Sequence, residues 1–306
     1  MSVPPGGMYS YSGLTDLGRQ REKNEDSHAE YPMADGSILL IVADGMGGHG
    51  HGDVASQIAI KVIGEVFQTT SGTDPRDRLH AGFITANQQI IAEAERIGGA
   101  GMGTTCVAVY LHGDKAWVAH IGDSRIYHIR DGHVLWRTTD HTRVQKMVEM
   151  GLLAPAAAKD HPDANVVTRA LGYAQLADGT VIEPDVRMEP IQLVPGDSLL
   201  LCSDGLYDDI EDVELSSAIP GKTPEEAGRM LIDLANSRGG HDNITCTILT
   251  FGSMVGGYSA ATRPTTIQAT VPPPGARKKS SAALMLLLIA AVVAAAAIAI
   301  FLATNH

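Results

Sequence analysis

The chain has 306 residues, of which 44% are hydrophobic, and it carries a formal net charge of −12. This length is enough for one large domain or two small ones with a sizeable core. All 35 acidic residues but only 19 of the 23 basic ones lie in residues 1–252, so the charge there is −16. A surface this acidic repels nucleic acid, and we therefore expect no nucleic-acid partner.

The N-terminal part of the chain predicts a short tail and then a folded domain. Residues 1–8 are expected to be disordered, and residues 9–252 to form the domain. No basic region followed by an apolar core occurs in Met1 to Tyr11, so we expect no signal peptide. The three cysteines, Cys106, Cys202 and Cys246, stand in apolar segments without a Cys-x-x-Cys pair. This pattern predicts buried, inert thiols in a reducing compartment rather than a zinc or redox site.

The first half of the domain mixes strand and helix signals. The apolar run Ile38 to Ala43 is typical of a buried strand. Apolar residues then recur every three or four positions from Val54 to Val66 and again from Leu79 to Ile97, which predicts two amphipathic helices. Asp74-Pro75 is expected to open the second helix, and Gly98-Gly99 to close it.

Further strands and helices follow in the second half. Strands are predicted over Cys106 to Leu111, Trp117 to Ile121, Arg125 to Ile129, Leu199 to Cys202 and Ile244 to Phe251. The first two of these are expected to turn at Gly113-Asp114. Helices are predicted over Thr142 to Met150 and Pro224 to Ser237. Strands, then helices, then strands favour an α+β layered domain over a doubly wound parallel sheet.

The C-terminal region differs in composition from the rest. Residues 253–281 are rich in Pro, Gly and Thr and predict an extended linker. Residues 282–303 (AALMLLLIAAVVAAAAIAIFLA) are uncharged, and as a helix they would span roughly 33 Å, enough to cross a membrane. Arg277, Lys278 and Lys279 precede this run. The positive-inside tendency therefore predicts a single-pass protein of the inner or plasma membrane with its domain in the cytoplasm.

Acidic residues follow or precede apolar runs at three distant places, Asp44-Gly45, Asp204-Gly205 and Asp242-Asn243. Each place is a predicted strand end, where a sheet can bring distant residues together. Clustered carboxylates repel one another unless cations neutralise them. The pattern therefore predicts a multi-carboxylate metal site and metal-assisted chemistry on an anionic substrate.

The glycine-rich segment from Asp44 to Asp53 follows the first predicted strand directly. Its glycines allow close backbone approach to a ligand, so a carbonyl such as that of Gly45 can join a carboxylate in coordination. A phosphate-binding loop and a simple flexible turn are the alternatives, although the Lys-Ser or Lys-Thr of a P-loop is missing. His49 and His51 are less suitable ligands than the surrounding oxygen donors.

Three other charged segments suit the same site. Arg21 offers a planar fork for a phosphate, and Glu25 and Asp26 can contact a metal or its water; a solvated turn is the alternative. Asp123 stands between two predicted strands, where an ordinary hairpin turn is the alternative. Asp208 follows Asp204, and capping of the next helix by Asp208 or Asp209 is its alternative.

Taken together, the ordered motifs resemble the metal-dependent Ser/Thr protein phosphatase family, protein phosphatase 2C type, in its bacterial form. The motifs are Arg-x-x-Asn-Glu-Asp, Asp-Gly-Met-Gly-Gly-His, Gly-Asp-Ser-Arg, Ser-Asp-Gly-Leu-x-Asp and Asp-Asn-Ile-Thr, with support from Gly103-Thr104-Thr105 and Thr168 to Gly172. The resemblance spans about residues 9–251. It implies a four-layer α-β-β-α sandwich of two antiparallel sheets flanked by helices.

The resemblance also implies roles for individual residues. Asp44 would bridge two metal ions, Mn²⁺ or Mg²⁺, and the Gly45 carbonyl would bind one of them. Asp204 and Asp242 would bind the other ion, and Glu25 and Asp26 would hold metal-bound waters or the nearby shell. A possible third ion would be bound by Asp123, Asp208 and Asp204. Arg21 would clamp the phosphate, and residues 141–163 resemble a mobile flap beside the site.

The implied activity is hydrolysis of phosphoserine and phosphothreonine in proteins. A hydroxide bridging two ions would attack phosphorus in line, without a covalent enzyme intermediate. Some family members carry His where this chain has Met46, and Met cannot donate a proton to the leaving alkoxide. No Cys-x5-Arg signature occurs, which excludes a cysteine phosphatase.

With the predicted membrane segment, this activity suggests an enzyme that opposes Ser/Thr kinases, including a cognate kinase, at the cytoplasmic membrane. Its partners would be phosphorylated Ser/Thr proteins. The alternatives are a membrane-tethered phosphopeptide-binding pseudophosphatase and a phosphatase for a sigma-factor regulatory partner. The intact set of carboxylates argues against a pure binding protein.

Overall fold

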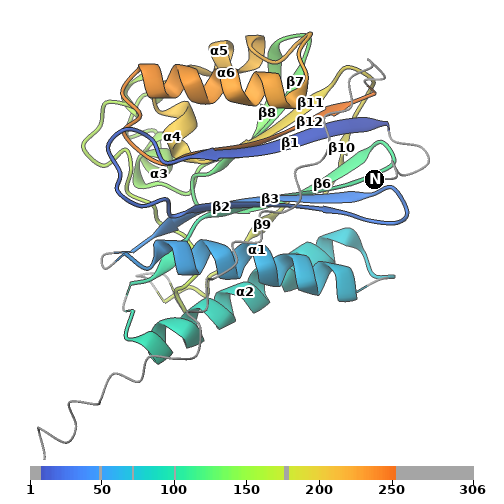
Figure 1. The fold of residues 1–306 in the computed structure, drawn as a ribbon. Coiled ribbons are helices and arrows are strands. Elements are labelled where there is room, and N and C mark those ends of the chain that lie inside the picture. Colours follow the sequence, from blue (N-terminus) through green and yellow to red (C-terminus); the bar gives the residue numbers. More distant parts are fainter. Residues whose placement is uncertain (1–7, 48–49, 71, 100, 176–178, 253–306) are drawn as a thin grey trace, which may run out of the picture. The chain divides into compact units, whose positions relative to one another are not determined.

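The computed structural model describes residues 8–47, 50–70, 72–99, 101–175 and 179–252. Within these ranges two antiparallel sheets pack face to face, and helices cover the outer face of each (Figure 1). This arrangement confirms the predicted α+β sandwich of four layers.

One sheet has five strands. Their order is β1 (Tyr9–Asp16), β12 (Ile244–Phe251), β11 (Ser198–Cys202), β7 (Arg125–Arg130) and β8 (His133–Arg137). Helices α5 (Asp212–Ser217) and α6 (Pro224–Ser237) lie over this sheet in Figure 1.

The other sheet has seven strands. The main path is β10 (Ile191–Gln192), β6 (Lys115–Ile121), β5 (Cys106–His112), β3 (Ile38–Met46) and β2 (Asp26–Pro32), with β4 (Gly103–Thr104) on β3 and β9 (Asp185–Val186) on β6. Helices α1 (Gly52–Thr69) and α2 (Pro75–Ile97) cover its outer face. The remaining helices are α3 (Arg143–Glu149), the 3₁₀ turn Pro155–Ala157 and α4 (Asp204–Tyr207).

Side chains alternate between the two faces of each sheet, so the core consists of three apolar layers. In β3, Leu39 and Ile41 pack toward α1 and α2, while Leu40 and Val42 face the other sheet. Successive side chains of a strand point to opposite faces, so a strand buried on both sides must be apolar at every position. A third layer lies between the five-stranded sheet and α4 to α6. This explains why the run Ile38 to Ala43 predicts a strand correctly although it does not alternate.

The predicted helices also form where their local signals place them. The Asp74 side chain accepts a hydrogen bond from the Arg76 N–H at the start of α2, and Gly98 ends the helix with φ 71°. Thr223 and Glu226 form a reciprocal capping box at the start of α6. These residues satisfy backbone groups that a helix end leaves without partners.

Strands β1 and β8 were not predicted. Both are edge strands, and β1 pairs with β12 from Tyr9↔Phe251 to Asp16↔Ile244. Its sequence, YSYSGLTD, is weakly apolar because most of its residues are only half-buried. The pairing across more than 200 residues supplies the strand structure that local preference does not.

Two predictions concern thiols and the membrane. All three cysteines are free and buried, as predicted, and burial raises the pKa of each thiol. Over the described ranges, no helix is both long enough and apolar enough to cross a membrane. The predicted linker 253–281, the predicted transmembrane helix 282–303 and residues 1–7 lie outside those ranges.

Candidate active site

Strands β2 and β3 place two of the predicted carboxylates side by side. Asp26 is the first residue of β2, and its register partner is Asp44 near the end of β3. The Asp44 carbonyl accepts hydrogen bonds from the Thr105 N–H, at 2.9 Å, and from the Thr104 hydroxyl, at 2.8 Å. The flexible-turn alternative for Asp44 and Gly45 is wrong, because both residues belong to β3.

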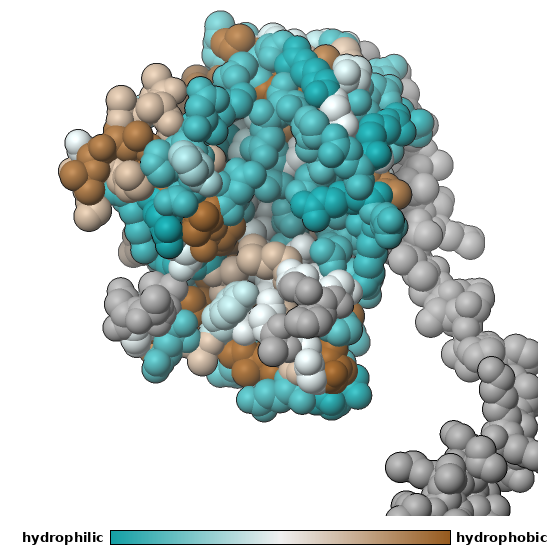
Figure 2. Space-filling view, turned by 90° about the vertical axis from the view of Figure 1, so that its left-hand side faces the viewer, coloured by the Kyte–Doolittle hydropathy of each residue, from teal (hydrophilic) through white to brown (hydrophobic). Residues whose placement is uncertain are grey.

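The other sheet supplies two more carboxylates at the same end of the sandwich. Asp204 follows β11 and begins α4, while Asp242 precedes β12, and these two strands are paired through Cys202↔Cys246. The Ser203 hydroxyl donates to Asp26 Oδ2 at 2.7 Å, and the charges of Asp26, Asp44 and Asp204 are close enough to repel one another. Both sheets therefore contribute to one acidic cluster, at the left-hand end of the molecule in Figure 1. Figure 2 looks onto that end, and its surface is predominantly hydrophilic.

Asp123 and Asp208 complete this cluster. Asp123 lies between β6 and β7, which belong to different sheets, so the hairpin-turn alternative for this segment is wrong. The Tyr207 hydroxyl donates to the Asp123 carbonyl at 2.9 Å, which ties the crossover to α4. Asp208 ends α4, and the following helix α5 is capped by Glu211 instead. The capping alternative for Asp208 and Asp209 is therefore also wrong.

Burial and mutual repulsion make this cluster electrostatically unfavourable without cations. Burial, with the neighbouring carboxylates, raises the pKa of Asp44 and of Asp123 well above the usual value. The same causes raise the pKa of Asp26 and of Asp208 to about 7, although hydroxyl donors to Asp26 and nearby cationic groups at Asp208 partly oppose them. Burial and Asp242 also raise the pKa of Asp204. Such shifts indicate a site designed for compensating positive charge.

The comparisons with known proteins agree on one family. Residues 18–222 match the family model described as Protein phosphatase 2C. A putative protein phosphatase 2C-type of Streptococcus pyogenes is 37% identical over 77% of this chain and 94% of its own length. The serine/threonine protein phosphatase PstP of Mycobacterium tuberculosis is also 37% identical, over 78% of this chain but only 44% of its own length.

A solved structure extends the likeness to the fold. The catalytic domain of PstP in complex with two manganese ions superposes with a TM-score of 0.68 at 34% identity, covering 80% of this chain and 99% of that domain. This chain belongs to the protein phosphatase 2C family.

The carboxylates of this protein phosphatase 2C domain fit divalent cations. Asp26 Oδ1 and Asp204 Oδ1 are buried and lack a hydrogen-bond partner within the described residues. An unpartnered buried carboxylate oxygen is costly in a folded protein and suits a cation. Carboxylate and carbonyl oxygens are also the ligands that Mn²⁺ and Mg²⁺ prefer.

Gly45 lies where backbone segments approach closely. A Cβ atom at this position would stand 2.1 Å from the Gly52 carbonyl oxygen and 2.5 Å from that of Glu25. Only glycine therefore fits between the end of β3, the start of α1 and the segment before β2. The coordinating role of its carbonyl stays a prediction.

Arg21 and Glu25 occupy the rim of the cluster. The Arg21 guanidinium donates to Asp242 Oδ2 at 2.6 Å, and its side chain is 51% exposed. It thus neutralises one predicted metal ligand and faces solvent, where a phosphate could approach. Glu25 Oε1 accepts the Gly52 N–H at 3.1 Å, next to the start of α1. His51 begins α1 without a side-chain capping bond, and His49 lies outside the described residues.

Sequence reasoning missed the residues that shape the cluster without joining it. The Asn243 side chain donates to the carbonyls of Leu17 and Lys23, and its Oδ1 accepts the Glu25 N–H at 2.8 Å. Asn243 therefore folds the segment that carries Arg21. Its motif, Asp-Asn-Ile-Thr, is visible in the sequence, but its contacts span more than 200 residues.

Proposed function

We propose that this chain hydrolyses phosphoserine and phosphothreonine esters in proteins with Mn²⁺ or Mg²⁺. The observation that carries the proposal is the cluster of aspartates, contributed by both sheets, whose charges repel one another. Asp26 and Asp123 are buried in it, and Asp44, Asp204 and Asp242 are half-buried. A structural role would favour fewer acids, because buried like charges destabilise a fold.

Asp44, Asp204 and Asp242 would hold the cations, with Asp26 and Glu25 beside them and Asp123 and Asp208 at a third position. Divalent cations in such a site lower the pKa of bound water and stabilise charge on phosphoryl oxygens. Arg21 supplies a planar, permanently charged fork whose geometry suits a phosphate. The hydrogen bonds from Ser203 and from Thr104 and Thr105 hold Asp26 and Asp44 in place.

Release of phosphate from a phosphothreonine peptide tests the activity. The full chain should release phosphate with Mn²⁺ and stop when a chelator is added. Asp44→Asn and Asp204→Asn should each remove nearly all turnover, whereas Asp233→Asn, on the exposed face of α6, should not. Wild-type turnover in either site variant with Mn²⁺ present would refute the metal assignment.

A membrane-tethered phosphopeptide-binding pseudophosphatase is the alternative. It would bind the same peptide without releasing phosphate at any Mn²⁺ or Mg²⁺ concentration. The Streptococcus pyogenes relative, matched over 94% of its length, and the PstP catalytic domain, matched over 99%, are named as phosphatases, which favours the enzyme.

We also propose that the enzyme opposes Ser/Thr kinases at the cytoplasmic membrane, held there by residues 282–303. The support is the uncharged run itself and the basic residues before it. Val292→Arg should release the full chain from membrane fractions, because a central arginine costs about 3 kcal/mol on insertion. Thr304→Arg, beyond the run, is the control. Unchanged fractionation of the Val292 variant would refute the anchor.

A further inference from the structure

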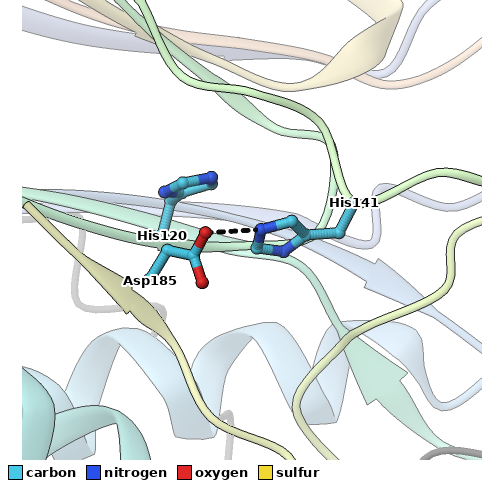
Figure 3. Close-up of side chains that lie close together, drawn as sticks. All are labelled: His120, His141 and Asp185. Atoms are coloured by element: carbon cyan, nitrogen blue, oxygen red, sulfur yellow. Dashed lines mark hydrogen bonds and ion pairs between the residues drawn. The ribbon is translucent and has the colours of Figure 1, made fainter. Parts of the chain in front are cut away.

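A second group of ionisable side chains lies beside the aspartate cluster. His120, on β6, and Asp185, on β9, are register partners, and His141 joins them from the segment before α3 (Figure 3). Their potential ligand atoms lie within 4.8 Å of one another, the only such His, Cys, Asp or Glu trio in the part of the chain that the structure describes. The geometry alone would suit a transition metal.

The hydrogen bonds of His141 argue against a metal. Burial lowers the pKa of His141, although the hydrogen bond to Asp185 acts in the opposite direction. The Gly122 N–H donates to His141 Nδ1 at 3.0 Å, while His141 Nε2 lies 3.3 Å from Asp185 Oδ2 and contacts the Arg169 guanidinium. Both ring nitrogens of His141 therefore already have partners, and the guanidinium beside Nε2 would repel a metal cation. Arg169 already supplies the positive charge, because its guanidinium contacts His141 and lies 2.5 Å from Asp185 Oδ1.

His141 forms hydrogen bonds with both backbone polar groups of Gly122. Besides accepting the Gly122 N–H, it donates its own N–H to the Gly122 carbonyl at 2.9 Å. Gly122 has φ +97°, and a Cβ there would come within 2.5 Å of Thr105. The turn therefore has a backbone conformation that only glycine adopts easily.

The residue after this turn is Asp123, whose carboxylate belongs to the acidic cluster. On the other side, the Thr105 hydroxyl hydrogen-bonds the Ser124 hydroxyl at 2.7 Å. Asp123 thus lies between two hydrogen-bonded neighbours, and the Tyr207 hydroxyl holds its own carbonyl. His141 contacts Gly122 through both the N–H and the carbonyl. A shift of this turn would move Asp123 relative to Asp204 and Asp208.

His141 also closes the base of the segment that follows it. Its carbonyl accepts the Thr168 N–H at 2.7 Å and the Thr168 hydroxyl at 2.9 Å. Thr142 and Val167 form an isolated bridge beside these bonds. The loop that resembles the family's flap is therefore joined to the Gly122 turn through this one histidine.

We propose that His141, oriented by Asp185 and Arg169, is a positioning residue that holds the Gly122–Asp123 turn so that Asp123 can contribute to cation binding. The inference rests on the proposed function, which assigns Asp123 to the third cation. Asp185 and Arg169 contact Nε2 and orient the ring so that Nδ1 faces the Gly122 N–H. Outer-shell groups of this kind typically change metal affinity by 10- to 100-fold when removed.

The test compares His141→Leu and His141→Asn with wild type in the full chain. Leu removes the acceptor, whereas the Asn Oδ1 can replace Nδ1 as partner of the Gly122 N–H. His133→Leu, an exposed residue of β8, is the matched control. Free Mn²⁺ is measured by electron paramagnetic resonance during titration, and hydrolysis of p-nitrophenyl phosphate is followed at each Mn²⁺ concentration.

We expect His141→Leu to raise the dissociation constant of the most weakly bound Mn²⁺ by about 10- to 100-fold. Its kcat at low Mn²⁺ should fall and recover with excess Mn²⁺, while KM for the ester stays nearly constant. His141→Asn should restore most of the binding. Asp185→Ala should raise the same dissociation constant by about two- to tenfold, because it removes one hydrogen bond to His141.

Wild-type Mn²⁺ affinity and stoichiometry in His141→Leu would overturn the proposal, as would equal losses in His141→Asn and His141→Leu. If His141→Leu does not fold, Asp185→Ala decides, because Asp185 is 53% exposed and its removal leaves the core intact. Unchanged binding in that variant would then overturn the proposal. A wild-type chain that binds Mn²⁺ without hydrolysing esters would refute the phosphatase activity, while the binding comparison would still decide the role of His141.

Discussion

Replacing Asp26 with Asn should stabilise the cation-free protein while impairing its activity. Asp26 has an ordinary pKa of 3.8 and a pKa of about 7 in the fold, raised chiefly by burial. The folded protein therefore binds this proton more tightly than the unfolded chain. The free energy of unfolding must fall as the pH rises from about 4 to about 7, and the full loss remains above pH 7.

The size of the stabilisation by Asp26→Asn follows from the difference between the two pKa values of Asp26. A change in pKa from 3.8 to about 7 corresponds to about 4 kcal/mol for an isolated group. In wild type, protonation of the neighbouring carboxylates relieves part of this cost. We therefore expect Asp26→Asn to raise the free energy of unfolding by about 3 kcal/mol at pH 8. Asn can still accept the Ser203 hydroxyl, and its amide can donate toward carboxylates where Asp26 Oδ1 has no partner. For a domain of this size, about 3 kcal/mol raises Tm by roughly 6–12 °C.

Thermal unfolding in a chelator at pH 5 and pH 8 measures this difference. Asp26→Asn should gain stability over wild type at pH 8 and much less at pH 5, and Asp233→Asn should change neither. Added Mn²⁺ should stabilise wild type, by about 2.7 kcal/mol at one hundred times Kd, and stabilise the variant less. An Asp26→Asn protein that is less stable than wild type at pH 8 without cations would refute the repulsion argument.

Three further changes probe other parts of the molecule. Arg21→Ala should raise KM for a phosphopeptide by about 10- to 100-fold with a smaller change in kcat, since a hydrogen bond to a charged group contributes about 1.5–3 kcal/mol; an unchanged KM would refute the phosphate role. Asp197 has no exposed surface, and hydrogen bonds from Arg130, Val194 and His128 outweigh burial and lower its pKa to about 2. Asp197→Asn should therefore cost about 2 kcal/mol in urea unfolding at pH 7, and this difference should vanish as the pH falls from about 4 to about 2; a constant difference would contradict it. Phe83→Ala should cost about 3–5 kcal/mol, because the ring is fully buried beneath the seven-stranded sheet, and a Tm unchanged within error would show that the layer repacks.

The positions of most elements followed from local signals. The run Ile38 to Ala43 is apolar at every residue because both of its faces are covered. Asp74-Pro75 and Gly98 define α2, and Thr223 with Glu226 defines the start of α6, because capping groups act within one turn of the helix end. The ordered acidic motifs likewise indicate a metal-dependent phosphatase, through their resemblance to that family.

The arrangement of the site depended on contacts that no local signal encodes. The sequence of a turn is similar whether the two strands it joins pair with each other or belong to different sheets. The sequence therefore could not distinguish the crossover at Asp123 from a hairpin. The register that sets Asp26 opposite Asp44, and the bond from Ser203 that joins the sheets, likewise depend on long-range pairing.

The sequence by itself determined which residues bury their apolar faces, where helices begin and end, and which acids belong to the family's motifs. Each of these properties depends on neighbours a few positions away. Only the tertiary structure decided that His141 holds the turn before Asp123, and that Arg21 pairs with Asp242. These contacts join residues 19 and 221 positions apart, so they depend on how the strands pair and the sheets pack rather than on near neighbours in the sequence.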